Sequence, residues 1–432
     1  MKKALSVFLM AAMAFGAFAD EPVADVNVAE FSGNAAVTWG VDLDSGKTGF
    51  KNSTEVNLKL NLLKGGTKST TGDGVWGELV LKADGDPIQW QQKAFSDTAF
   101  GANKGMMDGG ALKYKVYVDT AKIHFGPAYV GIKNGNTTVG ELKLDTAVRA
   151  DKAWLANVGA NKTDGIVAGF DSDVVKVDVD VRSLPTADTQ YTNDYGMAAE
   201  VEFKGVENLS VKGGVSYEFK EKGTLAYAAS AGYKLALDDT YYVRPQVGIT
   251  GVKDADPTLA ASVLFGWGEK KDAHAGVYFV NEDADKKVIP GVSVAVYVPL
   301  EDDPMVTIAP SFFSGEIVPG LTAAVDATIG TQSGKVRDIK WRNTATNLDA
   351  GVKYALAVDA LTITPQAGVE YYNYTSKVDD AKDSDNNMNM KIGVDVAGLI
   401  DNTTLSAVWT SGELLDGGVV AGTLDFTVKI AL

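Results

Sequence analysis

The sequence contains no cysteine among its 432 residues. Disulfide bonds and thiolate metal sites are therefore excluded, and no cysteine is present to carry a lipid anchor. Histidine is nearly absent as well, since only His124 and His274 occur, and neither stands beside a nucleophile motif. No G-x-S-x-G, H-E-x-x-H or phosphate-binding loop motif is present. The sequence therefore predicts no enzyme, no cofactor and no metal site.

Basic residues are outnumbered, because 40 Lys and Arg face 56 Asp and Glu, for a net charge of −16. An acidic chain of this kind argues against nucleic acid as a partner. After residue 19, no apolar run approaches the ~20 residues that a membrane-spanning helix needs. If the mature chain enters a membrane, it must do so as a closed β-barrel, because open strand edges cannot be satisfied in lipid.

The first residues, MKKALSVFLMAAMAFGAFAD, have the features of a secretory signal peptide. Lys2 and Lys3 precede an apolar run over residues 4–18, and Ala17-Phe18-Ala19 fits a small-x-small cleavage site. We expect cleavage after Ala19, with residues 20–432 exported as the mature chain.

Alternation of apolar and polar residues dominates the remaining sequence and predicts an all-β protein. The stretch VVKVDVDVRS (174–183) is typical, with valine at every second position from Val175 to Val181. We count roughly 20 such segments of about 9–13 residues, whereas strands of soluble proteins average ~5–6. The last one, residues 421–432, would span about 40 Å at ~3.3 Å per residue and about 28 Å when tilted by ~45°. These lengths favour a large antiparallel transmembrane barrel of about 16–22 strands over a soluble sandwich or β-helix, which stays the alternative.

Connections and breaks follow from turn residues and from gaps in the alternation. Asp359-Ala360 predicts a tight turn and residues 398–402 a short one, whereas residues 331–345 and 375–386 are expected to form long loops. Residues 87–110 are Gly-rich and irregular, so we expect an inward constriction or partial plug there. Pro245, Pro310 and Pro365 lie inside predicted strands, where we expect bulges, since proline removes a ladder donor.

The polar residues between lipid-facing ones should point into the lumen. Glu78 and Lys82 belong to this group. The predicted pore-lining residues are Lys59, Lys176, Asp178, Asp180, Arg182, Glu200, Glu202, Arg244, Lys353, Lys391 and Asp395. A barrel of this size with so polar an interior should hold water and conduct ions, with a weak preference for cations.

Two polar segments are candidates for surface binding. The segment GKVRDIKWRN (334–343) joins four basic residues to one tryptophan and could bind host matrix or sulfated glycans. Its residues are Lys335, Arg337, Lys340, Trp341 and Arg342. The acidic segment 377–387 has oxygen ligands at alternate positions, Asp383, Asp385 and Asn387, but it lacks the EF-hand glycine and closing glutamate. We therefore interpret it as a solvated loop.

The segment FSGNAAVTWGVDLDSGKTGFKN (31–52) resembles the treponemal major outer sheath protein family, which is related to the treponemal repeat proteins. Residues 121–159 carry a second resemblance, and the similarity extends along the chain. It implies an abundant outer-membrane β-barrel that forms large pores and a homo-oligomer, such as a trimer. It also implies adhesion to host matrix proteins such as fibronectin and laminin.

These observations together predict an outer-membrane porin for ions and small hydrophilic solutes that also acts as a surface adhesin. The alternative is a non-conducting adhesin or structural sheath protein with a plugged lumen. A barrel over residues 20–432 is expected. The family's division leaves open a partly periplasmic region over 20–160 with the barrel at 161–432. An outer-membrane hydrolase would need a histidine with an Asp, Ser or Asn partner near a rim, and nothing in the sequence points to one.

Overall fold

A computed structural model of the chain describes residues 29–64, 75–86, 113–133, 141–148, 153–156, 165–183, 195–219, 223–268, 277–280, 287–315, 318–336, 339–379, 381–415 and 421–431. The predicted signal peptide and the irregular stretch 87–110 lie outside these residues. No helix within the described ranges is long and apolar enough to cross a membrane.

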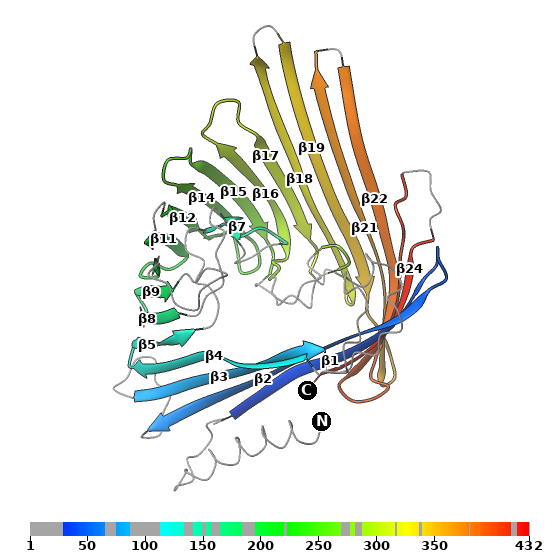
Figure 1. The fold of residues 1–432 in the computed structure, drawn as a ribbon, viewed down its shortest axis with the longest axis horizontal. Coiled ribbons are helices and arrows are strands. Elements are labelled where there is room, and N and C mark those ends of the chain that lie inside the picture. Colours follow the sequence, from blue (N-terminus) through cyan, green and yellow to red (C-terminus); the bar gives the residue numbers. More distant parts are fainter. Residues whose placement is uncertain are drawn as a thin grey trace.

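The described chain is built from antiparallel strands (Figure 1). Those of the first half are β1 (Ala29–Asp42), β2 (Thr48–Lys64), β3 (Val75–Asp86), β4 (Lys113–Phe125), β5 (Ala128–Lys133), β6 (Glu141–Lys143), β7 (Ala153–Ala156), β8 (Gly165–Asp171), β9 (Val175–Ser183), β10 (Tyr195–Phe203), β11 (Leu209–Phe219) and β12 (Leu225–Tyr233). Those of the second half are β13 (Leu235–Ala236), β14 (Tyr242–Val252), β15 (Thr258–Gly266), β16 (Gly291–Pro299), β17 (Val306–Phe313), β18 (Leu321–Val336), β19 (Ile339–Tyr354), β20 (Leu356–Val358), β21 (Leu361–Val378), β22 (Ala381–Ala397), β23 (Thr403–Thr410) and β24 (Thr423–Ala431).

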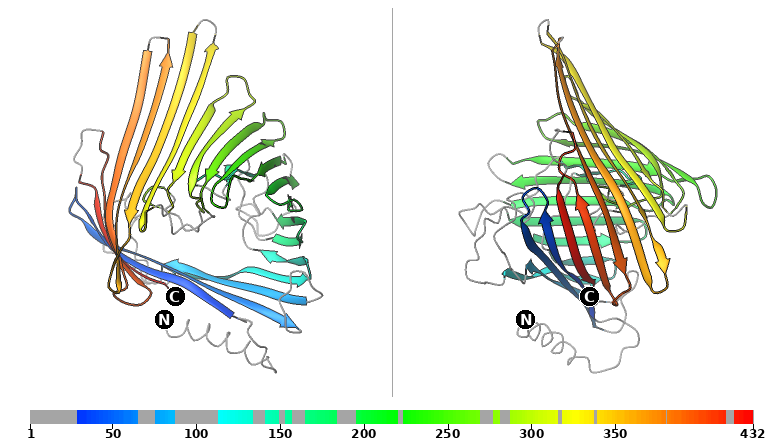
Figure 2. Two further views of the ribbon diagram at one scale, coloured as in Figure 1. Left: turned by 180° about the vertical axis from the view of Figure 1, so that it is seen from behind. Right: turned by 90° about the vertical axis from the view of Figure 1, so that its right-hand side faces the viewer.

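The sheet closes on itself, because its last strand pairs with its first. β24 lies antiparallel to β1 from the pair Asn34 and Ala431 to the pair Asp42 and Thr423, and Figure 2 shows the two strands side by side. The sheet has 22 strands, of which β13 and β20 are short extensions of β12 and β19. β13 pairs with β14 as β12 does, and β20 pairs with β21 as β19 does, so the wall of the barrel has 20 strands. The predicted fold class, a large antiparallel barrel, is confirmed.

The outer face of the wall is apolar and carries aromatic side chains near both rims. On β10, Tyr195 and Phe203 both point outward, eight residues and about 27 Å apart along the strand. Aromatic side chains at one level include Trp39, Tyr195, Tyr217, Phe219 and Phe426, and at the other level Phe203, Tyr233, Tyr241, Phe265 and Tyr354. Tyr and Trp concentrate at both interfaces of a bilayer, and an apolar band between two aromatic girdles is the outer surface of a membrane barrel.

The two rims differ in the length of their connections. On the rim that holds both ends of the barrel, residues 126–127, 172–174, 204–208, 355–360 and 398–402 are short connections. Opposite them, the connections 87–112, 134–164 and 184–194 are long, although this rim also has short connections at 43–47, 337–338 and 379–380 and the first rim has one long connection, 267–290. Short periplasmic turns and longer external loops are the pattern of bacterial barrels, so the first rim is periplasmic and the second external.

Two of the predicted long loops are wrong. Residues 331–345 and 375–386 lie almost wholly in β18, β19, β21 and β22, whose pairing continues to Val336 opposite Ile339 and to Val378 opposite Ala381. These four strands of 16 to 18 residues project beyond their neighbours and form a four-stranded blade (Figure 1). Apolar alternation is lost above the membrane because both faces are wet there, although backbone pairing continues.

The predicted bulges at the three prolines are also wrong, because the register is the same on both sides of each. Pro245 and Pro365 lie where the neighbouring strand is interrupted, between β12 and β13 and between β19 and β20. Pro310 likewise falls in a gap of the pairing between β17 and β18. Each proline, which has no backbone N–H to donate, thus lies where no hydrogen bond to that neighbouring strand is made.

Candidate functional site

The inner face of β9 to β11 carries a row of charges that alternate in sign. Cross-strand pairing places Lys176 beside Glu202, and Glu202 beside Lys212. Lys212 Nζ lies 3.4 Å from Glu202 Oε1, and Lys176 Nζ lies 3.3 Å from Asp178 Oδ2. The next row is acidic, because Asp178 pairs with Glu200 directly across the two strands. This part of the wall is therefore polar, partly ion-paired and net negative.

A second polar group lies on the inner face of β2 to β4. Lys59 Nζ is 3.9 Å from Glu78 Oε1, and Lys82 Nζ is 3.2 Å from Asp119 Oδ1. His124 Nε2 lies 3.8 Å from the other oxygen of Glu78. Charges of both signs pair across neighbouring strands here, which stiffens the wall while its surface stays hydrophilic.

The lumen side of the blade is acidic. Asp326, Asp349 and Glu370 occupy one row across β18, β19 and β21, each directly opposite the next. Deeper along the same face, Gln366 Nε2 donates a 2.9 Å hydrogen bond to Asp395 Oδ2, and Lys353 interacts with the same carboxylate. The charge on this side of the lumen is thus mostly negative.

A segment from the connection between β5 and β8 folds into the lumen. Residues 144–148 are buried against the inner face of β14 to β17, and Leu144 packs among apolar side chains of β15, β16 and β17. Gln246 holds the backbone of Asp145 from both sides: its Oε1 accepts the N–H at 3.0 Å and its Nε2 donates to the C=O at 2.8 Å. Arg244 pairs with the Asp145 carboxylate. The segment is fixed to the wall by residues about 100 positions away.

A second segment enters from the periplasmic rim, within the connection 267–290 between β15 and β16. The N–H of Ile289 donates to the C=O of Ala147 at 2.8 Å, and the N–H of Ala147 donates to Ser293 Oγ at 3.0 Å. Val277, Val280, Val288 and Ile289 join Ala147 and Val148 in one buried cluster with Tyr242, Leu264, Phe313 and Ala324. The two segments, named here the external and the periplasmic inward segments, therefore meet inside the barrel.

The periplasmic inward segment packs against a part of the wall where glycines leave room for it. Gly351 and Gly368 face each other across β19 and β21. A methyl group on Gly368 would lie 2.8 Å from Cβ and O of Tyr278, and one on Gly351 would lie 2.6 Å from Val277. Lys391 lies over the rings of Tyr278 and Phe279, with its Nζ 5.8 and 4.8 Å from the ring centroids. These contacts press residues 277–280 closely against β19, β21 and β22.

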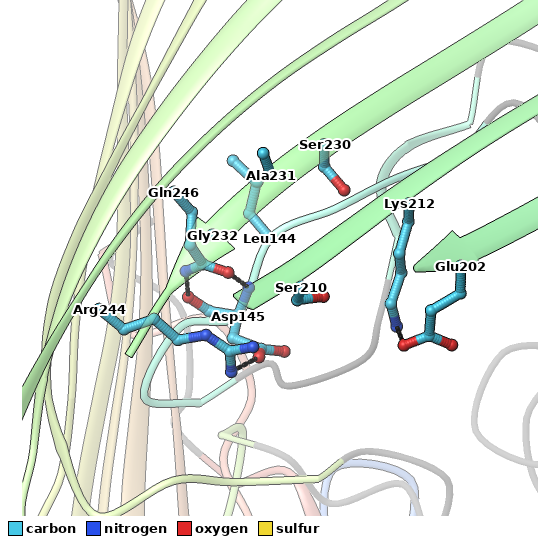
Figure 3. A pocket seen from close by; sticks show the side chains of 10 residues that line it. All are labelled: Leu144, Asp145, Glu202, Ser210, Lys212, Ser230, Ala231, Gly232, Arg244 and Gln246. Atoms are coloured by element: carbon cyan, nitrogen blue, oxygen red, sulfur yellow. Dashed lines mark hydrogen bonds and ion pairs between the residues drawn. The ribbon is translucent and has the colours of Figure 1, made fainter. Parts of the chain in front are cut away.

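A polar cavity of about 220 Å³ remains between the external inward segment and the wall (Figure 3). Its charged side chains are two ion pairs, Arg244 with Asp145 and Lys212 with Glu202. The remaining lining is formed by Leu144, Ser210, Ser230, Ala231, Gly232 and Gln246. The lining is therefore mainly hydrophilic, with hydroxyls, an amide and charges of both signs.

The predicted pore-lining residues do not share one environment. Arg244 and Lys391 contact the inward segments, whereas Lys176, Asp178, Glu200 and Glu202 stand on β9 and β10. Asp180 lies on the same face as Asp178 but is 5% exposed. The side chain of Arg182 and the whole of Arg337 lie outside the described residues.

The predicted surface cluster is divided by the strand pairing. Lys340 and Arg342 alternate with Trp341 along β19, so Trp341 faces the other side, beside Gly334 and Asp303. The acidic segment is also not a loop, because Asp383, Asp385 and Asn387 lie along β22. Among the described residues, no group of three His, Asp or Glu side chains is arranged to hold a metal ion.

Sequence reasoning missed Asp145, Gln246 and Ser293, which fix the external inward segment, and the acidic row of Asp326, Asp349 and Glu370. For Gln246, the sequence contains a weak signal. The stretches VRPQVG and ITPQAG each place a glutamine after an in-strand proline, and both glutamines, Gln246 and Gln366, bond inside the lumen. No local signal marks residues 144–148, which do not alternate.

Comparison with known proteins places the chain among spirochaete surface proteins. The major surface protein MspTL of Treponema lecithinolyticum is 30% identical over an alignment that covers 95% of this chain and 93% of the relative. The chain belongs to the treponemal major surface protein family. The major outer membrane protein MspA of Treponema maltophilum is 28% identical, with 98% and 96% covered. The resemblance inferred from residues 31–52 is thereby confirmed, although no family model matches the sequence.

Solved structures of outer-membrane proteins align with most of this chain, but with low TM-scores and low sequence identity. Acinetobacter baumannii OccAB4 gives a TM-score of 0.43 at 10% identity, with 95% of this chain and 100% of that chain covered. Pseudomonas aeruginosa OpdK, solved with vanillate, gives 0.44 at 10% identity, with 94% and 98% covered. The closed barrel rests on this chain's own strand pairing. Together with the family membership and the apolar outer band, this closed barrel places the chain in the outer membrane.

Proposed function

We propose that this protein forms a water-filled pore through which ions and small hydrophilic solutes cross the outer membrane. The observation that carries the proposal is the charged inner face of β9 to β11, where Lys176, Glu202 and Lys212 form a row that no apolar cluster of the described residues covers. Barrels of about 16–18 strands already leave an aqueous channel, and this wall has 20 strands. Among the described residues, the inward segments pack against the side of β14 to β22, and the side of β9 to β11 is the proposed solute path.

Cations are the preferred ions under this proposal. Asp178 and Glu200 stand on the path, and Glu370 adds negative charge across the lumen, in one row with the buried Asp326 and Asp349. Rings of acidic side chains concentrate cations and repel anions.

The test is conductance of the folded protein in planar bilayers. Discrete channel steps and a cation-selective reversal potential in a KCl gradient are expected. Asp178→Lys should move the reversal potential toward anions, whereas Asp173→Lys, an exposed change in the periplasmic turn 172–174, should not. A correctly folded, heat-modifiable sample without channel steps would instead support a plugged structural protein.

We further propose that residues 20–432 act as one barrel, since β1 to β5 belong to the closed sheet, which supports this over a periplasmic N-terminal region. A homo-oligomer and adhesion to host matrix proteins are proposed from the family resemblance. Size-exclusion chromatography with light scattering tests the first, and binding of immobilised fibronectin or laminin tests the second.

A further inference from the structure

The outer face of the blade changes character in steps from the membrane toward its tip. The last apolar row consists of Ala327, Leu348, Tyr371 and Met388, paired across β18, β19, β21 and β22. Two uncharged rows follow, which are polar except for Ile329. The next row is Ser333, Arg342, Lys377 and Lys382, and beyond it Lys335 pairs with Lys340. The pairing thus gathers five cations, here named the basic band, from two sequence segments, 335–342 and 377–382, that are 35 residues apart.

The basic band contains like charges in direct opposition. Arg342 pairs with Lys377, and Lys377 pairs with Lys382, so three cations stand side by side on three strands. All three side chains are exposed. Like charges placed directly opposite each other destabilise a sheet, so this row calls for an anion to neutralise it.

Among the described residues of the blade, no acidic side chain on the same face provides that anion. Along the outward positions of the blade's described strands, no Asp or Glu occurs, whereas the inward positions carry Asp326, Asp349, Glu370, Asp383, Asp385 and Asp395. In the described part of the chain, Lys340, Arg342, Lys377 and Lys382 form no ion pair. Asp379 in the tip turn accepts the backbone N–H of Lys340 at 3.1 Å instead. The two faces of the blade are therefore opposite in charge, with the cations on the side of the membrane.

The height of the band above the membrane selects the anion. Arg342 is six residues beyond Leu348, which is about 20 Å along the strand and about 14 Å above the apolar band at a tilt of ~45°. Simple phospholipid head groups end about 5–8 Å beyond the hydrocarbon core. Phosphates carried on the outer, non-acylated sugars of a glycolipid reach the level of the band.

We propose that the basic band binds the phosphorylated sugar head groups of glycolipids in the outer leaflet. Arginine and lysine are the side chains that bind phosphate, and three adjacent cations match a head group with more than one phosphate. The contact would hold the blade against the membrane surface and place a shell of lipid around this part of the barrel. It does not depend on conduction through the lumen.

The test uses the full-length protein in phosphatidylcholine vesicles that contain a glycolipid with two phosphates on its non-acylated core sugars, with native mass spectrometry of the extracted complexes. Vesicles with the dephosphorylated glycolipid, and vesicles with phosphatidylglycerol at equal charge, serve as comparisons. Retention of the phosphorylated glycolipid above both comparisons is expected. Equal retention of the dephosphorylated form would overturn the proposal.

The decisive variants change one residue, Lys377. Each cation near an anionic surface contributes to the binding free energy. Loss of one positive charge in Lys377→Gln should therefore weaken glycolipid binding about fivefold, and the change of two charges in Lys377→Glu should weaken it about thirtyfold. Lys377→Glu should also raise the unfolding temperature without glycolipid, because it sets an anion between Arg342 and Lys382. Lys253→Glu is the matched control on the same rim, exposed in the turn after β14, and should change neither quantity.

Two outcomes would overturn the assignment. The first is glycolipid binding by Lys377→Gln and Lys377→Glu at the wild-type level. The second is binding of soluble heparin, in detergent, more tightly than the phosphorylated glycolipid, with loss on Lys377→Glu. That result would assign the band to sulfated polysaccharide from outside the cell. If Lys377→Glu fails to fold, Lys377→Gln alone decides, since it adds no charge to the strand.

Discussion

Replacement of Gln246 by leucine tests whether the external inward segment sets the width of the lumen. The Gln246 amide makes two hydrogen bonds to the backbone of Asp145, at 3.0 and 2.8 Å, and a third to Ser262 Oγ at 2.9 Å. Gln246 is 6% exposed and Asp145 is 8% exposed, so water is nearly absent there. Leucine is close to glutamine in size but offers no donor or acceptor.

The size of the effect follows from the groups left without partners. A buried donor or acceptor that loses its partner costs about 1–3 kcal/mol, so stranding the N–H and C=O of Asp145 costs about 2–6 kcal/mol. That energy shifts the equilibrium between the docked and undocked segment by about 30-fold to about 10⁴-fold. The ion pair to Arg244 and the hydrogen bonds of Ala147 remain, so we expect frequent undocking with the barrel intact.

Single-channel recording in planar bilayers measures the outcome. Gln246→Leu should show a larger main conductance or frequent steps to a larger level. Ser293→Ala, which removes one bond to Ala147, should show the same change more weakly. Gln332→Leu is the control, because Gln332 also donates to a backbone carbonyl, that of Asp303, but outside the lumen. If Gln246→Leu is folded, heat-modifiable and conducts like the wild type, the external segment does not control the pore.

Two further predictions concern packing and pH. Gly368→Ala would set a methyl group 2.8 Å from Tyr278, should lower stability by about 1–3 kcal/mol in denaturant unfolding and should raise conductance as residues 277–280 move off the wall. In contrast, Gly213→Ala, where the methyl would meet its nearest atom at 3.9 Å, should change neither quantity. In the periplasmic turn, the carboxylate of Asp238 accepts the N–H groups of Tyr241 and Thr240, which holds its pKa below the ordinary value. A depressed pKa stabilises the fold above the unfolded value of about 3.9 and stops doing so as pH falls through the folded value. Asp238→Ala should therefore unfold at a lower temperature than the wild type at pH 7. The difference should shrink below about pH 3.9, and a constant difference down to pH 2.5 would contradict this account.

Much of the barrel was readable from the sequence, because each strand has to present one face to lipid and the other to water. The valines of 174–183 and the polar residues between them belong to opposite faces for that reason alone. Segment lengths of 9–13 residues indicated a membrane-spanning wall. The signal failed where that constraint ends: at the blade tips both faces are wet, so residues 331–345 and 375–386 resembled loops although they pair as strands.

The sequence by itself therefore determined the fold class, the two faces of the strands and the membrane as surroundings. Only the tertiary structure decided which residues meet. The row of Arg342, Lys377 and Lys382 exists because of register, which depends on turn length and on pairing with both neighbours. The inward segments were equally hidden, since Asp145 is held by Gln246, 101 positions away, and a contact that distant leaves no periodic trace. Alternation is a local consequence of strand geometry, whereas a constriction and a binding surface are made by contacts between distant parts of the chain.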